Sequence, residues 1–272
     1  MNNPFKPNER LKPVTIAIGL LSNDSIIVAA DSQTTCGNTK KTDAEKVACV
    51  DFADCSVMIA QAGNADRAGR AIEIFDEMAS HEEKLSTPRS AADLLERAIL
   101  QSKMELKHNQ GDCSMEELRD FILRHEQNFQ LLLAHYFKNV PYYYVADFWV
   151  GAATREKSHF AAIGTGAELA SYLLGEYFKP MTPFNTAFAT ALYVIEEVKK
   201  HDLYCIGKTR FAFARPDRPP GMMLQELIDD ICKELAKFND ITRESRNKTM
   251  TDMLESVGRE WAKKFKEEES QK

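Results

Sequence analysis

The stretch of sequence that decides the fold runs from Thr15 to Asp31 and reads TIAIGLLSNDSIIVAAD. Bulky apolar residues alternate with small ones over residues 15–20, and this period of two is typical of a β-strand. Residues 22–25 form a Ser-Asn-Asp-Ser turn signal, and the apolar run 26–30 is typical of a strand buried on both faces. The stretch therefore predicts a β-hairpin that ends at Asp31.

Outward from this hairpin, strand and helix patterns occur in blocks rather than in alternation. A doubly wound parallel sheet needs a helix between successive strands, so this order excludes it. The sequence instead predicts an α+β fold, a four-layer α-β-β-α sandwich of two antiparallel sheets. The other expected strands are 45–50, 56–60, 129–137, 141–150, 160–163, 201–206 and 209–214. The expected helices are 65–80, 90–107, a short one from 113, 167–177 and 183–200. A loop is expected over 36–42.

The two ends of the chain differ in composition from this block. Residues 1–14 are polar, hold three prolines and contain no apolar signal-peptide core, so we expect an extended leader. Residues 215–221, Arg-Pro-Asp-Arg-Pro-Pro-Gly, are expected to be a linker. Beyond them, apolar residues at helical spacing predict an amphipathic helix, followed by a charged helical tail. The expected division is a leader (1–14), a main domain (15–214) and a linker with a helical C-terminal extension (215–272).

Composition narrows the class of protein. The 272 residues carry 35 basic and 41 acidic side chains, a net charge of −6, whereas a nucleic-acid-binding protein is expected to show a basic surplus. No apolar run reaches the roughly 18 residues of a membrane span. The six cysteines form no CxxC pair, and without a secretory signal they are expected to be reduced thiols. We therefore expect a cytoplasmic protein that binds neither nucleic acid nor membrane.

Residues that can carry chemistry stand at strand ends and tight turns. A threonine hydroxyl is a poor nucleophile unless a base accepts its proton, and in one known arrangement that base is the threonine's own α-amine. A nearby lysine lowers the pKa values of the hydroxyl and the amine, and a carboxylate holds the lysine in place. A glycine turn leaves a backbone N–H free to stabilise an oxyanion. The candidate residues are Thr15, Asp31, Lys46, Gly63, Thr165, Asp202 and Cys205.

These pieces, in this order, resemble the proteasome β-subunit superfamily of N-terminal-nucleophile hydrolases, from about residue 14 to residue 214. The stretch Gly37-Asn38-Thr39 is also similar to the peptidase subunit of the bacterial two-component ATP-dependent protease. Each motif alone is weak, but seven of them follow in the family's order. The matching motifs are residues 15–19 (TIAIG), 26–35 (IIVAADSQTT), 37–39 (GNT), 45–47 (EKV), 62–66 (AGNAD), 162–166 (AIGTG) and 201–207 (HDLYCIG).

The resemblance implies a threonine-type peptidase that hydrolyses peptide bonds after its leader is removed. It implies peptide or unfolded-protein substrates and a homo-oligomeric ring, and it leaves open an ATP-dependent unfoldase as a partner. Among the site residues it implies Thr15 as the nucleophile, Lys46 and Asp31 as the lysine and carboxylate beside it, Gly63 or the peptide at Ala62 as the oxyanion turn, and Asp202 as a second aspartate. Thr165 and Cys205 stand where the family usually has serine; Thr165 keeps a hydroxyl, whereas Cys205 offers only a weak donor.

Two other functions stay open at this point. Val14 precedes Thr15 where active members of the family usually carry glycine, and a β-branched residue should crowd the peptide bond that must be cleaved. This departure, together with Cys205, favours a non-catalytic scaffold or binding protein in which Thr15 is an ordinary strand residue. The third possibility is an N-terminal-nucleophile amidase that acts on a small amide.

No cofactor and no metal are expected. The sequence Gly164-Thr165-Gly166 precedes a helix, but Leu169 stands where a dinucleotide-binding fingerprint requires its third glycine. The six histidines show no spacing typical of metal ligands.

Overall fold

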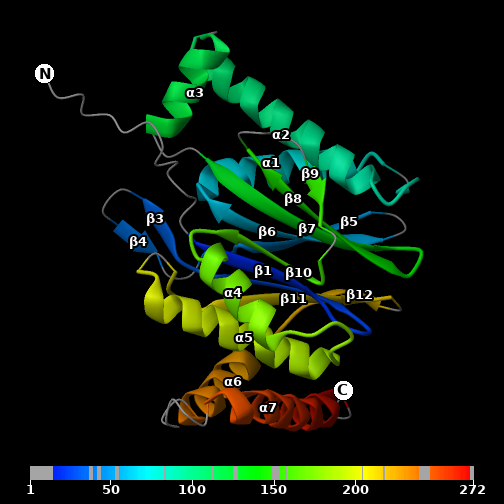
Figure 1. Ribbon diagram of the computed structural model, residues 1–272. Coiled ribbons are helices and arrows are strands. Elements are labelled where there is room, and N and C mark those ends of the chain that lie inside the picture. Colours follow the sequence, from blue (N-terminus) through cyan, green and yellow to red (C-terminus); the bar gives the residue numbers. More distant parts are fainter. Residues whose placement is uncertain are drawn as a thin grey trace, which may run out of the picture.

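The computed structural model describes residues 15–36, 39–41, 44–52, 55–82, 84–111, 113–124, 128–148, 153–156, 158–203, 205–216, 218–238 and 246–269. Within these residues, two five-stranded antiparallel sheets lie face to face (Figure 1). The first sheet has the order β10 (Phe160–Gly164), β1 (Ile16–Leu21), β2 (Ile26–Asp31), β11 (Thr209–Arg215), β12 (Arg218–Met222). The second has the order β5 (Val47–Asp51), β6 (Ser56–Gly63), β7 (Phe129–Phe137), β8 (Val140–Asp147), β9 (Ala153–Arg155).

Helices cover the outer face of each sheet and complete the predicted α-β-β-α sandwich (Figure 1). The second sheet is covered by α1 (Ala65–Ala79) and α2 (Ser90–Asn109), with α3 (Met115–Arg124) beside the C-terminal part of α2. The first sheet is covered by α4 (Ala167–Tyr177) and α5 (Phe184–His201). No helix in the described part of the chain is long and apolar enough to cross a membrane.

The alternation that predicted β1 separates two faces of the first sheet. Ile16, Ile18 and Leu20 pack in the core beneath α4 and α5, whereas the small residues face the second sheet. A Cβ added at Gly19 would lie 3.1 Å from the Leu132 side chain of β7. Small residues on this inner face therefore let the two sheets approach closely, which brings groups from both sheets into reach of one another.

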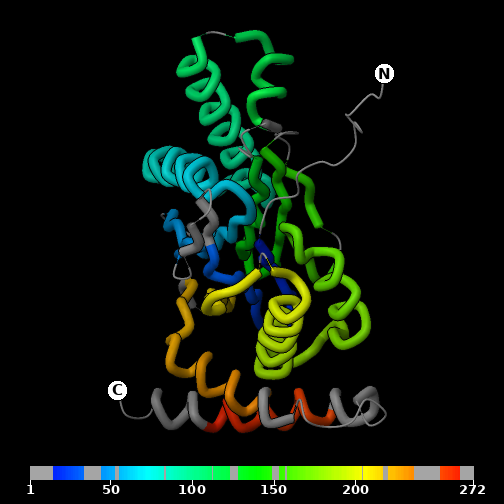
Figure 2. The backbone as a smooth tube through the Cα atoms, turned by 90° about the vertical axis from the view of Figure 1, so that its left-hand side faces the viewer, coloured from blue at the N-terminus to red at the C-terminus, as the bar shows by residue number. Residues whose placement is uncertain are grey.

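The C-terminal helices form a further layer outside α5. α6 (Gln225–Phe238) and α7 (Arg246–Glu269) lie beyond α5 in both views (Figures 1 and 2). The Trp261 ring of α7 stacks on Phe188 of α5, with 4.8 Å between the ring centroids. A Cβ at Gly258 would lie 2.9 Å from the backbone of Asn185, so α7 crosses the start of α5 at close range. The extension is thus part of the hydrophobic core that covers the first sheet.

Three local predictions differ from the structure. Residues 201–206 were expected to form a strand, but α5 continues to His201, and Cys205 donates its N–H to Asp202 O in a turn. The expected loop over 36–42 contains part of a small hairpin, β3 (Thr34–Cys36) with β4 (Thr39–Lys41). The expected linker 215–221 contains most of β12, an edge strand of the first sheet. The predicted leader, 1–14, lies outside the described residues.

Candidate functional site

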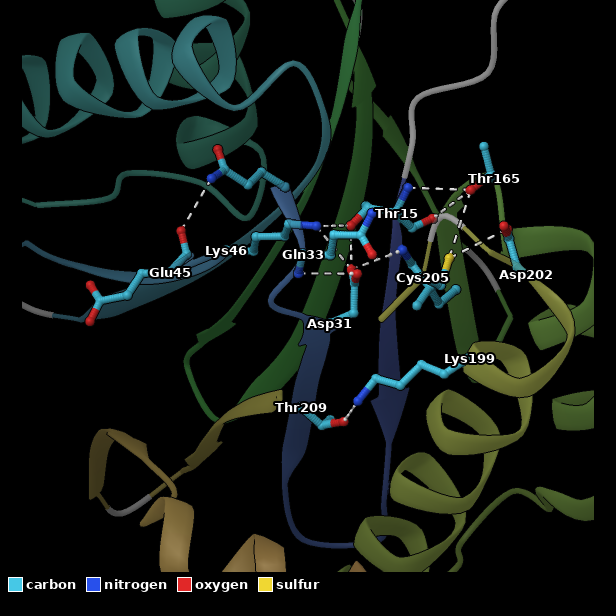
Figure 3. A network of polar contacts seen from close by, with 12 residues as sticks. Thr15, Asp31, Gln33, Glu45, Lys46, Thr165, Lys199, Asp202, Cys205 and Thr209 are labelled. Carbon is cyan, nitrogen blue, oxygen red and sulfur yellow. Dashed lines mark hydrogen bonds and ion pairs between the residues drawn. The ribbon is translucent and has the colours of Figure 1, made fainter. Parts of the chain in front are cut away.

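Three polar residues meet at the end of the first sheet where β1 begins and β2 ends (Figure 3). Thr15 immediately precedes β1, Asp31 is the last residue of β2, and Lys46 immediately precedes β5 of the opposite sheet. Because β1 and β2 pair as a hairpin, with Ala17 opposite Ala30, Thr15 and Asp31 are placed side by side. Lys46 reaches them from the other sheet.

The Asp31 carboxylate accepts hydrogen bonds from four donors. The Thr15 hydroxyl donates to Asp31 Oδ1, and Lys46 Nζ donates both to Thr15 Oγ1 and, at 3.0 Å, to Asp31 Oδ1. The backbone N–H groups of Ile16 and Gln33 donate to the same carboxylate, at 3.2 and 3.3 Å. A carboxylate bound in this way has one orientation, and it fixes the lysine against the hydroxyl.

This cluster is closed to water. Thr15 and Asp31 have no exposed surface, and Lys46 is 3% exposed. Burial lowers the pKa of Lys46 below its ordinary value; the charge of Lys199 adds to this, whereas Asp31 and Cys205 act in the opposite direction. A lysine with a lowered pKa releases its proton more readily, so Lys46 is suited to proton transfer at Thr15 Oγ1.

A second group of polar residues holds the backbone of Thr15. The Thr15 N–H donates to Thr165 Oγ1 at 3.3 Å, and the Thr165 hydroxyl faces Thr15 O at 3.2 Å. Thr165 Oγ1 lies 3.7 Å from Cys205 Sγ, and the thiol donates to Asp202 Oδ2 at 3.4 Å. Burial, with the charges of Asp31 and Asp202, raises the pKa of the Cys205 thiol. The thiol therefore stays protonated, donates to Asp202 and lies against the Thr165 hydroxyl, whose proton is directed at Thr15 O.

The glycines on both sides of Thr165 are required by close packing, of Gly164 on Thr15 and of Gly166 on Val198. Gly164 has φ +95°, and a Cβ there would lie 2.2 Å from Thr15 O. The Gly166 N–H donates to the same carbonyl at 3.2 Å, and a Cβ at Gly166 would lie 2.5 Å from Val198 Cγ1. Only glycine fits at these positions, so the turn 164–166 wraps around the residue that carries the hydroxyl.

Gly63 ends β6 beside this turn. It has φ +103°, a conformation that favours glycine, and Asn64 then caps α1 by accepting the Arg67 N–H at 3.0 Å. Its neighbour Ala62 would lie 3.2 Å from a Cβ at Gly164. The candidate oxyanion turn thus comes from the second sheet and lies next to the turn that holds Thr15.

Comparison with known proteins identifies the fold. No protein-family model matches the sequence, and no curated protein matches it. Among solved structures, Anbu (ancestral β-subunit) from Yersinia bercovieri matches with a TM-score of 0.63; the match covers 98% of that chain and 84% of this one. The chain has the N-terminal-nucleophile hydrolase fold of a proteasome β-subunit. The sequence identity is 14%, so the comparison shows the fold alone, and the roles of residues depend on the geometry of the site.

In this proteasome-type fold, polar residues that the sequence analysis did not single out support the site. Gln61 donates its backbone N–H to Lys46 O at 2.9 Å and its side-chain N–H to Glu45 O at 3.2 Å, so it holds the segment that carries Lys46. Gln130 accepts the Gly164 N–H at 3.0 Å. Each is a polar residue in a mainly apolar strand, and that pattern was the available signal in the sequence.

A further polar group lies beneath Asp31. Thr209 is paired with Asp31 across β2 and β11, and Lys199 of α5 donates to Thr209 Oγ1 (Figure 3) and, at 2.7 Å, to Glu196. Among the described residues, no group of three or more histidine, cysteine, aspartate or glutamate side chains is placed to hold a metal ion.

Proposed function

We propose that this protein is a threonine-type peptidase that hydrolyses peptide bonds with Thr15 as its N-terminal nucleophile. One observation carries the proposal: Lys46 and Asp31, from opposite sheets, both contact Thr15 Oγ1 in a site without water access. A buried lysine with a lowered pKa beside a threonine hydroxyl is costly to stability. Such clusters of perturbed groups are concentrated at functional sites.

The first step in the proposal is cleavage of the Val14–Thr15 bond. Hydrolysis of this bond would remove residues 1–14 and create a free α-amine on Thr15. That amine would lie at the Thr15 nitrogen, 3.3 Å from Thr165 Oγ1. Thr165, linked through Cys205 to Asp202, would then orient the amine.

The second step is attack on a substrate carbonyl. The α-amine of Thr15 accepts the hydroxyl proton, directly or through a water molecule, and Thr15 Oγ1 attacks the substrate carbonyl. The C–N bond of the substrate then breaks, the amine product leaves with the proton from the α-amine, and the acyl part stays on Thr15 Oγ1 as an ester. Water then hydrolyses the ester and regenerates the hydroxyl. Lys46, held by Asp31, favours the deprotonated oxygen throughout.

The developing oxyanion would be stabilised by the backbone N–H at Gly63. Loss of one such donor costs about 3–4 kcal/mol of transition-state stabilisation in comparable sites. Gly63 and Thr15 belong to different sheets, so this stabilisation requires the two sheets to be held in a fixed relation at this end of the sandwich.

A homo-oligomeric ring and peptide or unfolded-protein substrates belong to the same proposal, and an ATP-dependent unfoldase would be a compatible partner. The second candidate function is a scaffold or binding protein, favoured by the β-branched Val14 and by the complete burial of Thr15. An amidase for small amides would use the same site with a different substrate.

A panel of fluorogenic peptides and small amides tests these functions with the purified wild type, Thr15→Ala and Thr15→Ser. We expect the wild type to cleave peptides, Thr15→Ser to keep reduced activity because it retains a hydroxyl and an amine, and Thr15→Ala to lose turnover with unchanged circular dichroism. Full hydrolysis by Thr15→Ala would refute the mechanism. Cleavage of small amides alone would indicate the amidase, and a wild type that keeps its leader and cleaves nothing would indicate the scaffold.

A further inference from the structure

Gln130 connects the two sheets where the two halves of the proposed site meet. It lies near the start of β7, in the sheet that carries Gly63. Thr15 and the turn 164–166 belong to the other sheet. The hydrogen bond between Gln130 Oε1 and the Gly164 N–H therefore connects the sheet that carries the candidate oxyanion turn at Gly63 to the turn that holds Thr15.

The backbone of Gln130 is fixed on both sides by its strand neighbours. It is paired with Ala62 of β6 on one side and with Asp147 of β8 on the other. Directly paired residues place their side chains on the same face of a sheet, and Ala62 packs in the core between the sheets. The side chain of Gln130 thus points into the space between the sheets, one position away from the pairing partner of Gly63.

The orientation of the Gln130 amide follows from its two partners. The Gly164 N–H can only donate and an Asp147 carboxylate oxygen can only accept. Gln130 Oε1 accepts from Gly164 at 3.0 Å, and Gln130 Nε2 lies 3.5 Å from Asp147 Oδ2. Rotation of the amide by 180° would place its N–H donors against the Gly164 N–H and its oxygen against the Asp147 carboxylate, so a single orientation is favoured.

Gly164 transmits this constraint to Thr15. The backbone of Gly164 is packed so closely on Thr15 O that a Cβ would lie 2.2 Å from it. The next two residues of the turn, Thr165 and Gly166, bond to the backbone of Thr15. A displacement of the Gly164 N–H toward the second sheet, or away from it, therefore displaces the residue that carries the hydroxyl.

The geometry points to Gln130 as a positioning residue that sets the separation between Thr15 and the oxyanion turn at Gly63. This inference rests on the proposed peptidase function. Gln130 touches neither the hydroxyl nor the substrate carbonyl; it acts through Gly164. A displacement of about 1 Å between reacting groups can cost about 100-fold in rate, so loss of this one bond should reduce the chemical step far more than substrate binding.

The test compares three variants with the wild type. Gln130→Met keeps the length of the side chain and removes the acceptor; we expect kcat to fall about 10- to 100-fold with KM within about twofold. Tyr143→Phe is the matched control, because it removes another hydrogen bond between the sheets, from Tyr143 to His159 O at 2.7 Å, and it should leave kcat near the wild-type value. Gln130→Glu combined with Asp147→Asn keeps an acceptor for Gly164, exchanges donor and acceptor between positions 130 and 147 and preserves the net charge, so it should restore most of kcat.

Hydrogen exchange provides a readout that does not depend on activity. The amides of residues 164–166 should exchange faster in Gln130→Met than in Tyr143→Phe or the wild type. An inactive wild type would refute the proposed peptidase and leave the exchange measurement to decide the role of Gln130. Unchanged exchange at 164–166, a kcat of Gln130→Met equal to that of Tyr143→Phe, or a folded double variant without recovery would overturn the inference.

Discussion

The Asp31 carboxylate receives the Thr15 hydroxyl and the Lys46 ammonium in a fully buried position. We predict that Asp31→Asn abolishes activity and lowers the free energy of unfolding by about 3–5 kcal/mol, because removal of one partner leaves a buried charge without compensation. Urea denaturation measures the change. Asp230→Asn, which removes an exposed ion pair with Lys233 on α6, is the control and should leave stability almost unchanged. Equal stability of the two variants would contradict the buried pair.

The Cys205 thiol should make stability depend on pH in the alkaline range. Its pKa is raised above the ordinary value of 9.0 by burial and by Asp31 and Asp202. Above pH 9 the unfolded chain loses the thiol proton while the folded chain keeps it, so this residue lowers stability as pH rises. We predict that the free energy of unfolding falls less steeply above pH 9 in Cys205→Ser than in the wild type. Parallel curves, measured by urea denaturation at several pH values, would contradict the assignment.

At the scale of single residues, the sequence and its family resemblance indicated which side chains would meet. Thr15, Asp31, Lys46, Thr165, Asp202 and Cys205 form one hydrogen-bonded cluster, and their catalytic roles stay predictions. Gln130 and Gln61 were missed, because a glutamine in a strand becomes informative only when the structure shows what its amide reaches. Gln130 reaches Gly164 of the opposite sheet, and Gln61 reaches Glu45, just before the neighbouring strand β5. Lys199 was missed for the same reason, since its partner Thr209 lies on another element.

At the scale of elements, α7 should contribute to the stability of the main fold. Trp261 is 2% exposed and packs on Phe184 and Phe188 of α5. We predict that Trp261→Ala lowers the free energy of unfolding by about 3–5 kcal/mol, the usual cost of truncating a buried aromatic side chain. Thermal and urea denaturation measure it, with Glu255→Ala on the exposed side of the same helix as the control. A single transition with unchanged stability would mean that α7 does not support the core.

The bounds of helices and strands were predicted well where the apolar residues recur with a clear period, and poorly where tertiary packing determines the secondary structure. The β1–β2 hairpin and α4 lie where the sequence placed them. The strand β12 was read as a linker because of Pro219 and Pro220, but an edge strand has a free side on which proline removes no ladder hydrogen bond. Residues 201–206 end in a short apolar run and were expected to form a strand, yet His201 is the last residue of α5 and Cys205 donates its N–H to Asp202 O in a turn.

At the scale of the whole molecule, we predict a homo-oligomer. Three large apolar side chains are exposed in the single chain. Tyr172 in α4 is 66% exposed, Met181 between α4 and α5 is 74% exposed, and Leu203 after α5 is 81% exposed. Apolar groups of this size are favoured at contacts between subunits. Light scattering at micromolar concentration should give a mass several times that of one chain, whereas a monomer across the same range would contradict the ring.

In the proposed mechanism, Thr15 becomes a free, activated N-terminal nucleophile. The most direct test is the intact mass of the purified wild type after incubation with a peptide β-lactone, whose strained ring acylates an activated hydroxyl. We expect a chain that has lost residues 1–14 and carries a single adduct, with no adduct on Thr15→Ala. A wild-type chain that keeps residues 1–14 and remains unmodified would contradict it.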